Sequence, residues 1–456
     1  MTQKLWGSAF KSKTDPLVEI YTSSIDADQI LAEYDIKIGM AHAKMLAKKK
    51  IISKRDSSKI VASLNKMLNE LKKGNLEISV SEEDIHTAIS NLLKKKIGKL
   101  ADKLHTGRSR NDLVVTDFKM YAKDNCLIVL KLLSDLQKAL LKLAEHNTDK
   151  IVYGYTHLKR AQYISFSHYA LAFMELFHRD KARIKDALKR LDTLDLGSCA
   201  LSGTSLELDR SYVVKELGFL APSSNSIDSV SSRDFAIEIL SDLSILSCNI
   251  SRLAEDFIIY SSDEFGVIKI DDSFTTGSSI MPHKKNPDIL ELLRGQAGII
   301  YGNLMAMLTI MKGLPTSYNR DMQYDKEILS SAFEKTEIGL LVLVKLLGKV
   351  TVNDSKITEV EELFSVDLME HLIKKSVSYR DAHDLIGQLL KYACEKGKKI
   401  KELKSAELKK FGIDEKFLKN LDKNKSVNFK NVYGGTAITQ VRKQIKAWKT
   451  KISKTN

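Results

Sequence analysis

The sequence is poor in the residues that interrupt helices. Of its 456 residues, only 5 are proline and 22 are glycine. Proline breaks helices and glycine weakens them, so their scarcity favours long uninterrupted helices over many short strands. Hydrophobic residues make up 43% of the chain, which excludes disorder as its main state. The chain is also longer than the roughly 250–300 residues at which single cores stop growing, so we expect more than one structural unit.

Membrane and secretory signals are also missing. No apolar run approaches the roughly 20 residues that a membrane span needs. The first 15 residues lack the apolar core of a signal peptide. We therefore expect a soluble, cytoplasmic protein with no membrane partner. The four cysteines form no CxxC pair, and their wide spacing favours buried free thiols over disulfides or a metal site: Cys126, Cys199, Cys248 and Cys394.

Charge is abundant and biased toward cations. The chain has 72 Lys and Arg against 58 Asp and Glu, a formal net charge of +14. Such a balance suits nucleic acid or acidic small substrates. The lysines occur in short scattered runs without interleaved aromatic residues, which favours a solvated lysine-rich surface. The alternative, a nucleic-acid-binding protein, predicts affinity that falls steeply with salt.

Apolar residues recur every three and four positions along five long segments between residues 112 and 349. One series runs from Phe235 to Tyr260, and this spacing places its side chains on one helical face. Another series begins at Tyr163, and the segment from Ile338 to Leu347 is apolar almost all round. The pattern predicts an all-α fold with a central bundle of long helices, in a monomer or across subunits. We expect three domains: an N-terminal helical domain over 1–111, the bundle over 112–360, and a small helical domain over 361–456.

The segment Thr275–Asp288 (TTGSSIMPHKKNPD) carries the densest polar chemistry. Pro282 and Pro287 exclude regular helix through its middle, and a helix is expected to open directly after it. Lys284 and Asn286 add donors that could hold a carboxylate and stabilise negative charge developing on it. The alternative is an ordinary polar loop.

Three other polar segments offer candidate functional groups. His105–Asp112 (HTGRSRND) supplies arginines suited to carboxylate binding, or an interdomain turn held by ion pairs. Tyr153–Gln162 contains His157, a candidate proton carrier or a structural histidine. Gly313–Glu327 places polar side chains at a turn feeding a helix. No Walker, GxGxxG, HExxH or GxSxG motif is present, which argues against nucleotide-driven, zinc-protease and common serine-hydrolase chemistry.

Together these segments resemble the fumarase/aspartase superfamily, whose signature loop looks like GSSIMPHKKNP here. HTGRSRND is the more discriminating segment and is similar to the argininosuccinate lyase family. The resemblance covers nearly the whole chain and includes further matching segments: Leu5–Phe10, Glu83–His86, Gly154–Gln162, Gly197–Arg210, Asn225–Arg233, Leu314–Lys326, Tyr379–Gly387 and Gly434–Thr436.

The resemblance implies a mostly helical, three-domain subunit that assembles into a homotetramer with a twenty-helix core. Each active site would then take residues from three subunits. The implied reaction is the reversible cleavage of argininosuccinate to arginine and fumarate, in arginine biosynthesis. No metal, organic cofactor, nucleic acid or membrane is implied.

The resemblance also implies roles for individual residues. Ser278 is the expected base, and Lys284 and Asn286 would hold the reacting succinyl carboxylate. His157 would donate or relay a proton to the leaving group, paired with Glu291 of another subunit. The reverse assignment of base and acid to Ser278 and His157 stays open. Further residues match substrate-binding positions: Ser24, Asn111, Thr156, Tyr318, Gln323 and Lys326, with Arg108 and Arg110 in the same motif.

Some positions depart from the family pattern. Tyr163 and Ile438 stand where proline is usual, Cys199 stands in a turn usually written Gly-x-Gly-Ala, and His283 replaces a common glutamine. None of these removes a proposed catalytic group. Two alternatives remain within the resemblance: a sister lyase acting on another succinyl or aspartyl substrate, and an inactive crystallin-like structural copy.

Overall fold

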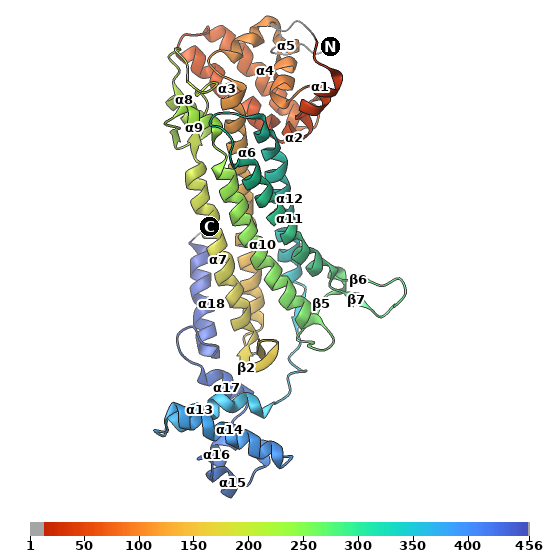
Figure 1. Ribbon diagram of the computed structural model, residues 1–456, viewed down its shortest axis with the longest axis vertical. Coiled ribbons are helices and arrows are strands. Elements are labelled where there is room, and N and C mark those ends of the chain that lie inside the picture. The colour runs from red at the N-terminus through yellow and green to blue at the C-terminus, as the bar shows by residue number, and fades with distance from the viewer. Residues whose placement is uncertain (1–12, 455–456) are drawn as a thin grey trace. The chain divides into compact units, whose positions relative to one another are not determined.

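The computed structural model describes residues 13–454, and their regular structure is almost entirely helical (Figure 1). The helices are α1 (Pro16–Thr22), α2 (Ile25–Asp28), α3 (Ala32–Lys48), α4 (Lys54–Lys72), α5 (Ile85–Ile97), α6 (Arg110–His146), α7 (Phe166–Leu191), α8 (Arg210–Leu217), α9 (Ser226–Ser231), α10 (Asp234–Ser261), α11 (Asp288–Met311), α12 (Asp325–Leu347), α13 (Ser365–Ile373), α14 (Tyr379–Glu395), α15 (Ser405–Lys409), α16 (Glu415–Lys419), α17 (Lys423–Phe429) and α18 (Ile438–Ser453). The predicted all-α class is confirmed. The matching segment Leu5–Phe10 lies outside the described residues.

Short strands pair two by two. The strands are β1 (Ile151–Thr156), β2 (Lys159–Ser165), β3 (Thr193–Leu194), β4 (Ala221–Pro222), β5 (Ile268–Ile270), β6 (Thr276–Gly277), β7 (Lys285–Asn286) and β8 (Val350–Val352). β1 pairs with β2, β3 with β4, β5 with β8 and β6 with β7. Only β3–β4 is parallel. Two of the hairpins, β1–β2 and β6–β7, carry residues that the sequence analysis singled out.

The chain divides into two compact units, each made of three separate stretches. The first unit comprises residues 1–131, 180–247 and 296–338, and the second comprises 132–179, 248–295 and 339–456. The predicted three-domain division, with boundaries near residues 111 and 360, stays a prediction.

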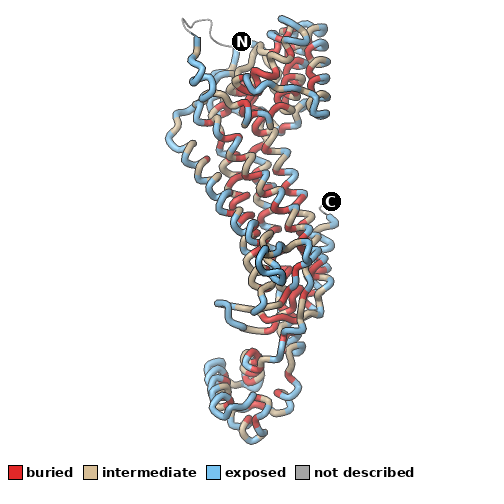
Figure 2. Tube along the Cα trace, turned by 90° about the vertical axis from the view of Figure 1, so that its right-hand side faces the viewer, coloured by how far each residue is buried: buried red, intermediate tan, exposed pale blue. Residues whose placement is uncertain are grey.

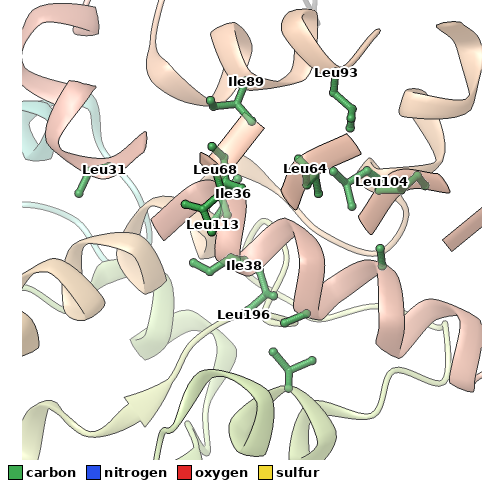
Figure 3. Close-up of a cluster of buried hydrophobic side chains, with 14 of the residues drawn as sticks. Leu31, Ile36, Ile38, Leu64, Leu68, Ile89, Leu93, Leu104, Leu113 and Leu196 are labelled. Carbon is green, nitrogen blue, oxygen red and sulfur yellow. The ribbon is translucent and has the colours of Figure 1, made fainter. Parts of the chain in front are cut away.

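The first unit contains a core built from short helices. Contacts join α3 to α4 and α5, and apolar side chains of these helices and of α6 meet in one cluster (Figure 3). Polar caps define where the helices begin: Ser53 accepts a hydrogen bond from the Asp56 N–H at 3.0 Å, and Asp84 accepts one from the Thr87 N–H at 2.7 Å. The cap at Asp84 also starts the helix that carries His86 toward the candidate site.

The five predicted apolar stripes lie on α6, α7, α10, α11 and α12, and buried positions recur along these long helices (Figure 2). In the first unit, the rings of Phe118 and Phe235 lie 5.5 Å apart. In the second, the rings of Tyr169 and Tyr260 lie 5.3 Å apart. The one wrong assignment is Tyr163, which lies in β2. Its hydroxyl accepts a hydrogen bond from the Val360 N–H at 2.6 Å.

The cysteines are all free, as predicted, but the expectation that they are buried is correct only for Cys126. Cys199 is half-buried, and Cys248 and Cys394 are exposed. Among the described helices, none combines the length and the apolar character that a bilayer crossing requires.

Candidate active site

A polar pocket in the first unit gathers side chains from four separate stretches of the chain. Six of its lining residues were predicted to bind substrate: Ser24, Arg110, Asn111, Tyr318, Gln323 and Lys326. The remaining lining residues were not predicted: Asp28, Asp84, His86, Val114 and Arg320. The pocket therefore brings together most of the expected substrate-binding set within one unit.

Glu83 links these stretches at the pocket. Its carbonyl accepts a hydrogen bond from the Ser24 N–H at 2.9 Å. Its carboxylate lies 3.2 Å from Nη1 of Arg110 and 3.1 Å from Nη2 of Arg320. Arg110 also pairs with Asp84 at 2.8 Å. Burial opposes the ionisation of Asp84, but His86 and Arg110 outweigh it and lower the pKa of this carboxyl. Both arginines are thus held in place by carboxylates before any substrate binds.

Lys326 supplies a buried positive charge to the pocket. Its Nζ donates to Asp325 at 2.6 Å and lies 4.0 Å from Asp28, while Asp325 also pairs with Arg233. Burial acts against ionisation of Asp325, yet Lys326 and Arg233 lower the pKa of this carboxyl. At Asp28, burial raises the pKa of the carboxyl by more than the charge of Lys326 lowers it. The ammonium group is therefore fixed in position, which suits binding of an anionic substrate group.

His86 is the most informative lining residue that sequence reasoning missed. Its Nδ1 lies 2.6 Å from Asp35 and 3.4 Å from Asp117. Burial alone would lower the pKa of His86, but the hydrogen bond to Asp35 raises it. Its Nε2 is buried and has no hydrogen-bond partner within residues 13–454. The pocket therefore contains an imidazole ring that is oriented by the Asp35 carboxylate on α3.

Asp35, His86 and Asp117 form the one group among the described residues with ligand atoms close enough to hold a metal ion. Two observations argue against that use. The Nδ1 of His86 lies 2.6 Å from Asp35, and this hydrogen bond raises the pKa of the ring, which opposes the deprotonation that metal coordination requires. The Arg108 guanidinium also interacts with both Asp35 and Asp117. We interpret the group as a buried ion cluster and assign it no metal.

Arg108 does not line the pocket, although Arg110 of the same motif does. Its Nε and Nη1 are buried without hydrogen-bond partners among the described residues, and burial lowers the pKa of the guanidinium. It faces the buried carboxylates of Asp112 and Asp117. Its place in the structure is thus typical of a positioning residue, and its contact with substrate stays a prediction.

Asp112, next to Asn111 at the start of α6, holds a neighbouring turn in place. The carboxylate accepts hydrogen bonds from the backbone N–H groups of Ser109 (2.8 Å), Gly197 (2.8 Å) and Cys199 (2.7 Å). Burial raises its pKa to about 6, although these three donors act in the opposite direction. The Asn111 side chain in turn donates to the Ala200 carbonyl at 3.1 Å. HTGRSRND is therefore tied to the turn at Gly197–Ala200.

The departure at Cys199 has a structural consequence. This residue adopts a left-handed backbone with φ of 55°. An L-residue other than glycine pays roughly 1–2 kcal/mol for that conformation. The usual glycine would avoid this cost, while the Cys199 N–H still reaches Asp112. The departure thus strains the turn without removing its hydrogen bond.

Replacing Asp112 with alanine is expected to destabilise the protein by about 3 kcal/mol, because three N–H donors would lose their acceptor in a largely buried turn. Chemical denaturation at neutral pH measures this loss. Asp102→Ala is the matched control, since its carboxylate is exposed and forms a surface ion pair with Lys94. Equal stability of the two variants would show that Asp112 does not hold the turn.

The remaining predicted residues belong to the second unit. The β6–β7 hairpin carries the signature loop, which extends away from the helices (Figure 1). Asn286 pairs with Thr276 across the hairpin, and Ser278 follows β6 directly. The Ser278 Oγ accepts hydrogen bonds from the N–H groups of Ile280 (3.3 Å) and Met281 (3.1 Å). Lys284 is exposed on the same loop.

Ion pairs and hydrogen bonds anchor the base of this hairpin. Lys285 reaches both carboxylate oxygens of Asp272 at 2.7 Å, and the Thr276 hydroxyl donates to Asp288. α11 begins at Asp288, which confirms the predicted helix start after Pro287. Glu291 lies exposed on the first turns of α11. The loop thus has a fixed base and an exposed tip.

His157 and Thr156 lie at the tip of the β1–β2 hairpin and are exposed. His157 and Leu158 have φ of 54° and 57°, as expected for a two-residue turn of the mirror-image type. Within residues 13–454, no hydrogen bond joins His157 to Ser278 or Glu291. Within the described residues, the three predicted groups therefore form no shared hydrogen-bond network.

Comparison with known proteins shows the family of the chain. A family model described as Lyase matches residues 8–302, and one described as Argininosuccinate lyase C-terminal matches residues 363–428. The argininosuccinate lyase of Sulfurihydrogenibium sp. (strain YO3AOP1) is 45% identical over 450 residues, or 98% of each chain. That of Clostridium perfringens is 43% identical over 458 residues, which cover 99% of this chain and 98% of the relative.

Solved structures share the fold. EDDS lyase in complex with formate matches with a TM-score of 0.82 and 25% identity, over 97% of this chain and 91% of that chain. Class II fumarase from Schistosoma mansoni matches with a TM-score of 0.75 and 19% identity, over 86% and 90% of the two chains. The fold and the signature segments together define a lyase of the fumarase/aspartase superfamily. Within it, the chain belongs to the argininosuccinate lyase family.

Proposed function

We propose that the protein catalyses the reversible β-elimination of argininosuccinate to L-arginine and fumarate, in arginine biosynthesis. The pocket of the first unit carries this proposal, because it combines Arg110 and Asn111 of HTGRSRND with Tyr318, Gln323 and Lys326. Fixed cations and amides at this position suit a substrate with several carboxylates. In this proposal the protein acts in the cytoplasm and binds neither nucleic acid nor a membrane.

The reaction requires removal of a proton from a carbon next to a carboxylate, which is weakly acidic. The resulting dianion needs donors placed in advance. Lys284 and Asn286 supply an ammonium and an amide on the signature hairpin. The pairing of β6 with β7 brings their segment next to Ser278. We assign these two residues to the reacting succinyl carboxylate.

Ser278 is the proposed base, and its surroundings address the weakness of serine as a base. The two backbone N–H groups that donate to its Oγ would stabilise an alkoxide, since hydrogen bonds to a charged form favour that form. The loop is exposed in the isolated subunit, so closure over substrate would exclude water and strengthen these bonds. Ser278 would then take the proton from the substrate carbon.

His157 is the proposed proton donor to the departing guanidino nitrogen, with Glu291 of a neighbouring subunit orienting its ring. Thr156 would bind substrate beside it. The exposure of this hairpin tip and of Glu291 fits a site completed by other subunits. His86 joins the set as a further cationic contact, because its partnerless Nε2 belongs to a pocket-lining side chain.

A homotetramer with a twenty-helix core is part of this proposal, as is a subunit of three domains with boundaries near residues 111 and 360. The long helices support the tetramer, because they leave apolar side chains exposed that a monomer would not cover. On α11 these include Leu292 (73% exposed) and Met305 (63%), and on α12 Ile338 (53%). Large apolar side chains exposed on these long helices suit surfaces that neighbouring subunits would cover.

Met305→Glu is therefore expected to convert the tetramer to smaller species, because a charge would be buried without a partner at the helical core. Size-exclusion chromatography with light scattering measures the mass. Lys443→Glu on α18 is the control, since it changes charge on an exposed polar position of another helix. A Met305→Glu variant that stays tetrameric would place α11 outside the assembly core.

Substrate comparison separates this function from that of a sister lyase. We expect fumarate release from argininosuccinate but none from adenylosuccinate or malate under the same conditions, because Arg110 and Asn111 come from the discriminating HTGRSRND segment. Cleavage of each substrate can be followed by ultraviolet absorbance, with authentic enzymes as positive controls. Preferential cleavage of adenylosuccinate or malate would reassign the substrate while keeping the superfamily.

A further inference from the structure

The C-terminal helices of the second unit form an open cleft that the proposed reaction does not use. The cleft measures about 630 Å³, within the roughly 300–1,000 Å³ typical of small-molecule sites. It lies along α16 and α17, and its walls mix aromatic, aliphatic and basic side chains: Asp414, Lys416, Phe417, Asn420, Leu421, Lys425 and Phe429. None of these residues lines the pocket of the first unit.

An aromatic row forms one wall of the cleft. The His371 ring stacks on Phe417 with centroids 3.8 Å apart and planes inclined by 12°. Phe429 continues the row at 6.3 Å from Phe417, with an interplanar angle of 8°. Phe429 is 44% exposed at the end of α17, although it is apolar. The row therefore ends in a partly exposed aromatic ring on which a planar group can stack.

The charges around this wall are unbalanced in favour of cations. The carboxylate of Asp414 is neutralised by Lys375 and lies 3.3 Å from His371. These two partners lower the pKa of Asp414. Glu415, the other acidic group at the start of α16, pairs with Lys419 at 2.5 Å. Asp414 and Glu415 are thus each already paired with a lysine.

Three lysine ammonium groups at the cleft have no carboxylate partner within the described residues. Lys416 and Lys425 line it, and Lys374 places its Nζ 5.9 Å from the centre of the Phe429 ring. Within the described part of the chain, none of the three forms an ion pair with a carboxylate. The Nζ of Lys425 donates to the Asn420 carbonyl at 2.5 Å, while its backbone N–H donates to the Asp422 carboxylate at 2.8 Å. The cleft therefore offers several positive charges next to an aromatic surface.

We propose that this cleft binds a nucleoside phosphate. The base would stack on Phe429, and the phosphate oxygens would contact Lys416 and Lys425. Aromatic rings stack any base through its π-face, and lysine binds phosphate as a point charge. Three unmatched ammonium groups suit the multiple charge of a phosphate chain better than a single carboxylate. The open shape of the cleft and its exposed lysines make binding strongly dependent on salt.

Equilibrium dialysis of the full-length protein against ATP at low ionic strength tests this site. ATP is expected to bind more tightly than adenosine, which lacks the charge, and more tightly than tripolyphosphate, which lacks the ring. Phe429→Ala should weaken ATP binding roughly tenfold or more, the loss expected when a base loses its stacking partner. It should leave tripolyphosphate binding unchanged.

A second variant keeps the test informative if Phe429→Ala misfolds. Lys416→Glu with Lys425→Glu changes only exposed side chains and should abolish ATP binding, whereas Lys391→Glu at an exposed position of α14 should not. Circular dichroism verifies that each variant is folded. Equal affinity for ATP and tripolyphosphate, or ATP binding that survives the double substitution, would overturn the proposal.

Discussion

The variant Ser278→Ala is expected to lose roughly 10²–10⁴-fold in kcat, the contribution typical of a positioned general base. Its KM should change little, because the carboxylate contacts of Lys284, Asn286 and the pocket remain. The folded state should be retained, since the Ser278 side chain accepts hydrogen bonds only from the exposed loop itself. Steady-state kinetics with argininosuccinate, together with light scattering, measures these effects.

The neighbouring Ser279 provides a matched control for this variant. It has the same hydroxyl on the same exposed loop, but no role in the proposed chemistry. Ser279→Ala should therefore retain activity within a few-fold. If Ser278→Ala were as active as the parent, the base would have to be another group, and His157 would be the first candidate.

Activity is expected to reappear when two inactive variants, Ser278→Ala and His157→Asn, are unfolded together and refolded as a mixture. Each site would take its serine and its histidine from different subunits. After random assembly of equal amounts, about a quarter of the sites would receive both intact residues. The exposure of both hairpin tips in the isolated subunit supports this sharing.

Two controls define this complementation experiment. Each variant refolded alone should remain inactive, and native mass spectrometry with one mass-tagged variant should show mixed tetramers. Inactive mixed tetramers would mean that both residues of each site come from one chain. Replacing His157→Asn with Glu291→Gln in this mixture tests in the same way whether Glu291 reaches the site from another subunit.

Periodicity predicted the long helices well, because their apolar faces follow from the geometry of the helix alone. The series from Phe235 to Tyr260 falls within α10, and the expected helix start after Pro287 is the first residue of α11. Tyr163 was assigned to a helix because its apolar side chain extends the spacing of α7 backwards. Its hydrogen bond with the distant Val360 N–H is a tertiary contact, and no local pattern reveals it.

The candidate site was predictable only where motif residues line the pocket themselves. Lys326 and Arg110 fall in segments that the resemblance singles out, and both line the pocket. His86 lies in such a segment too, but its role depends on Asp35, which is 51 residues away in the chain. Cys199 was recognised as a departure, yet only the fold shows that its N–H must reach Asp112 from a left-handed backbone.

The most direct test of the proposed function is to add argininosuccinate to the purified protein and measure both products. Fumarate can be followed by its ultraviolet absorbance and arginine by a separate assay. We predict that both appear in equal amounts, at a rate proportional to protein concentration. A folded tetramer that releases neither product would contradict the proposed reaction, even though the chain belongs to the argininosuccinate lyase family.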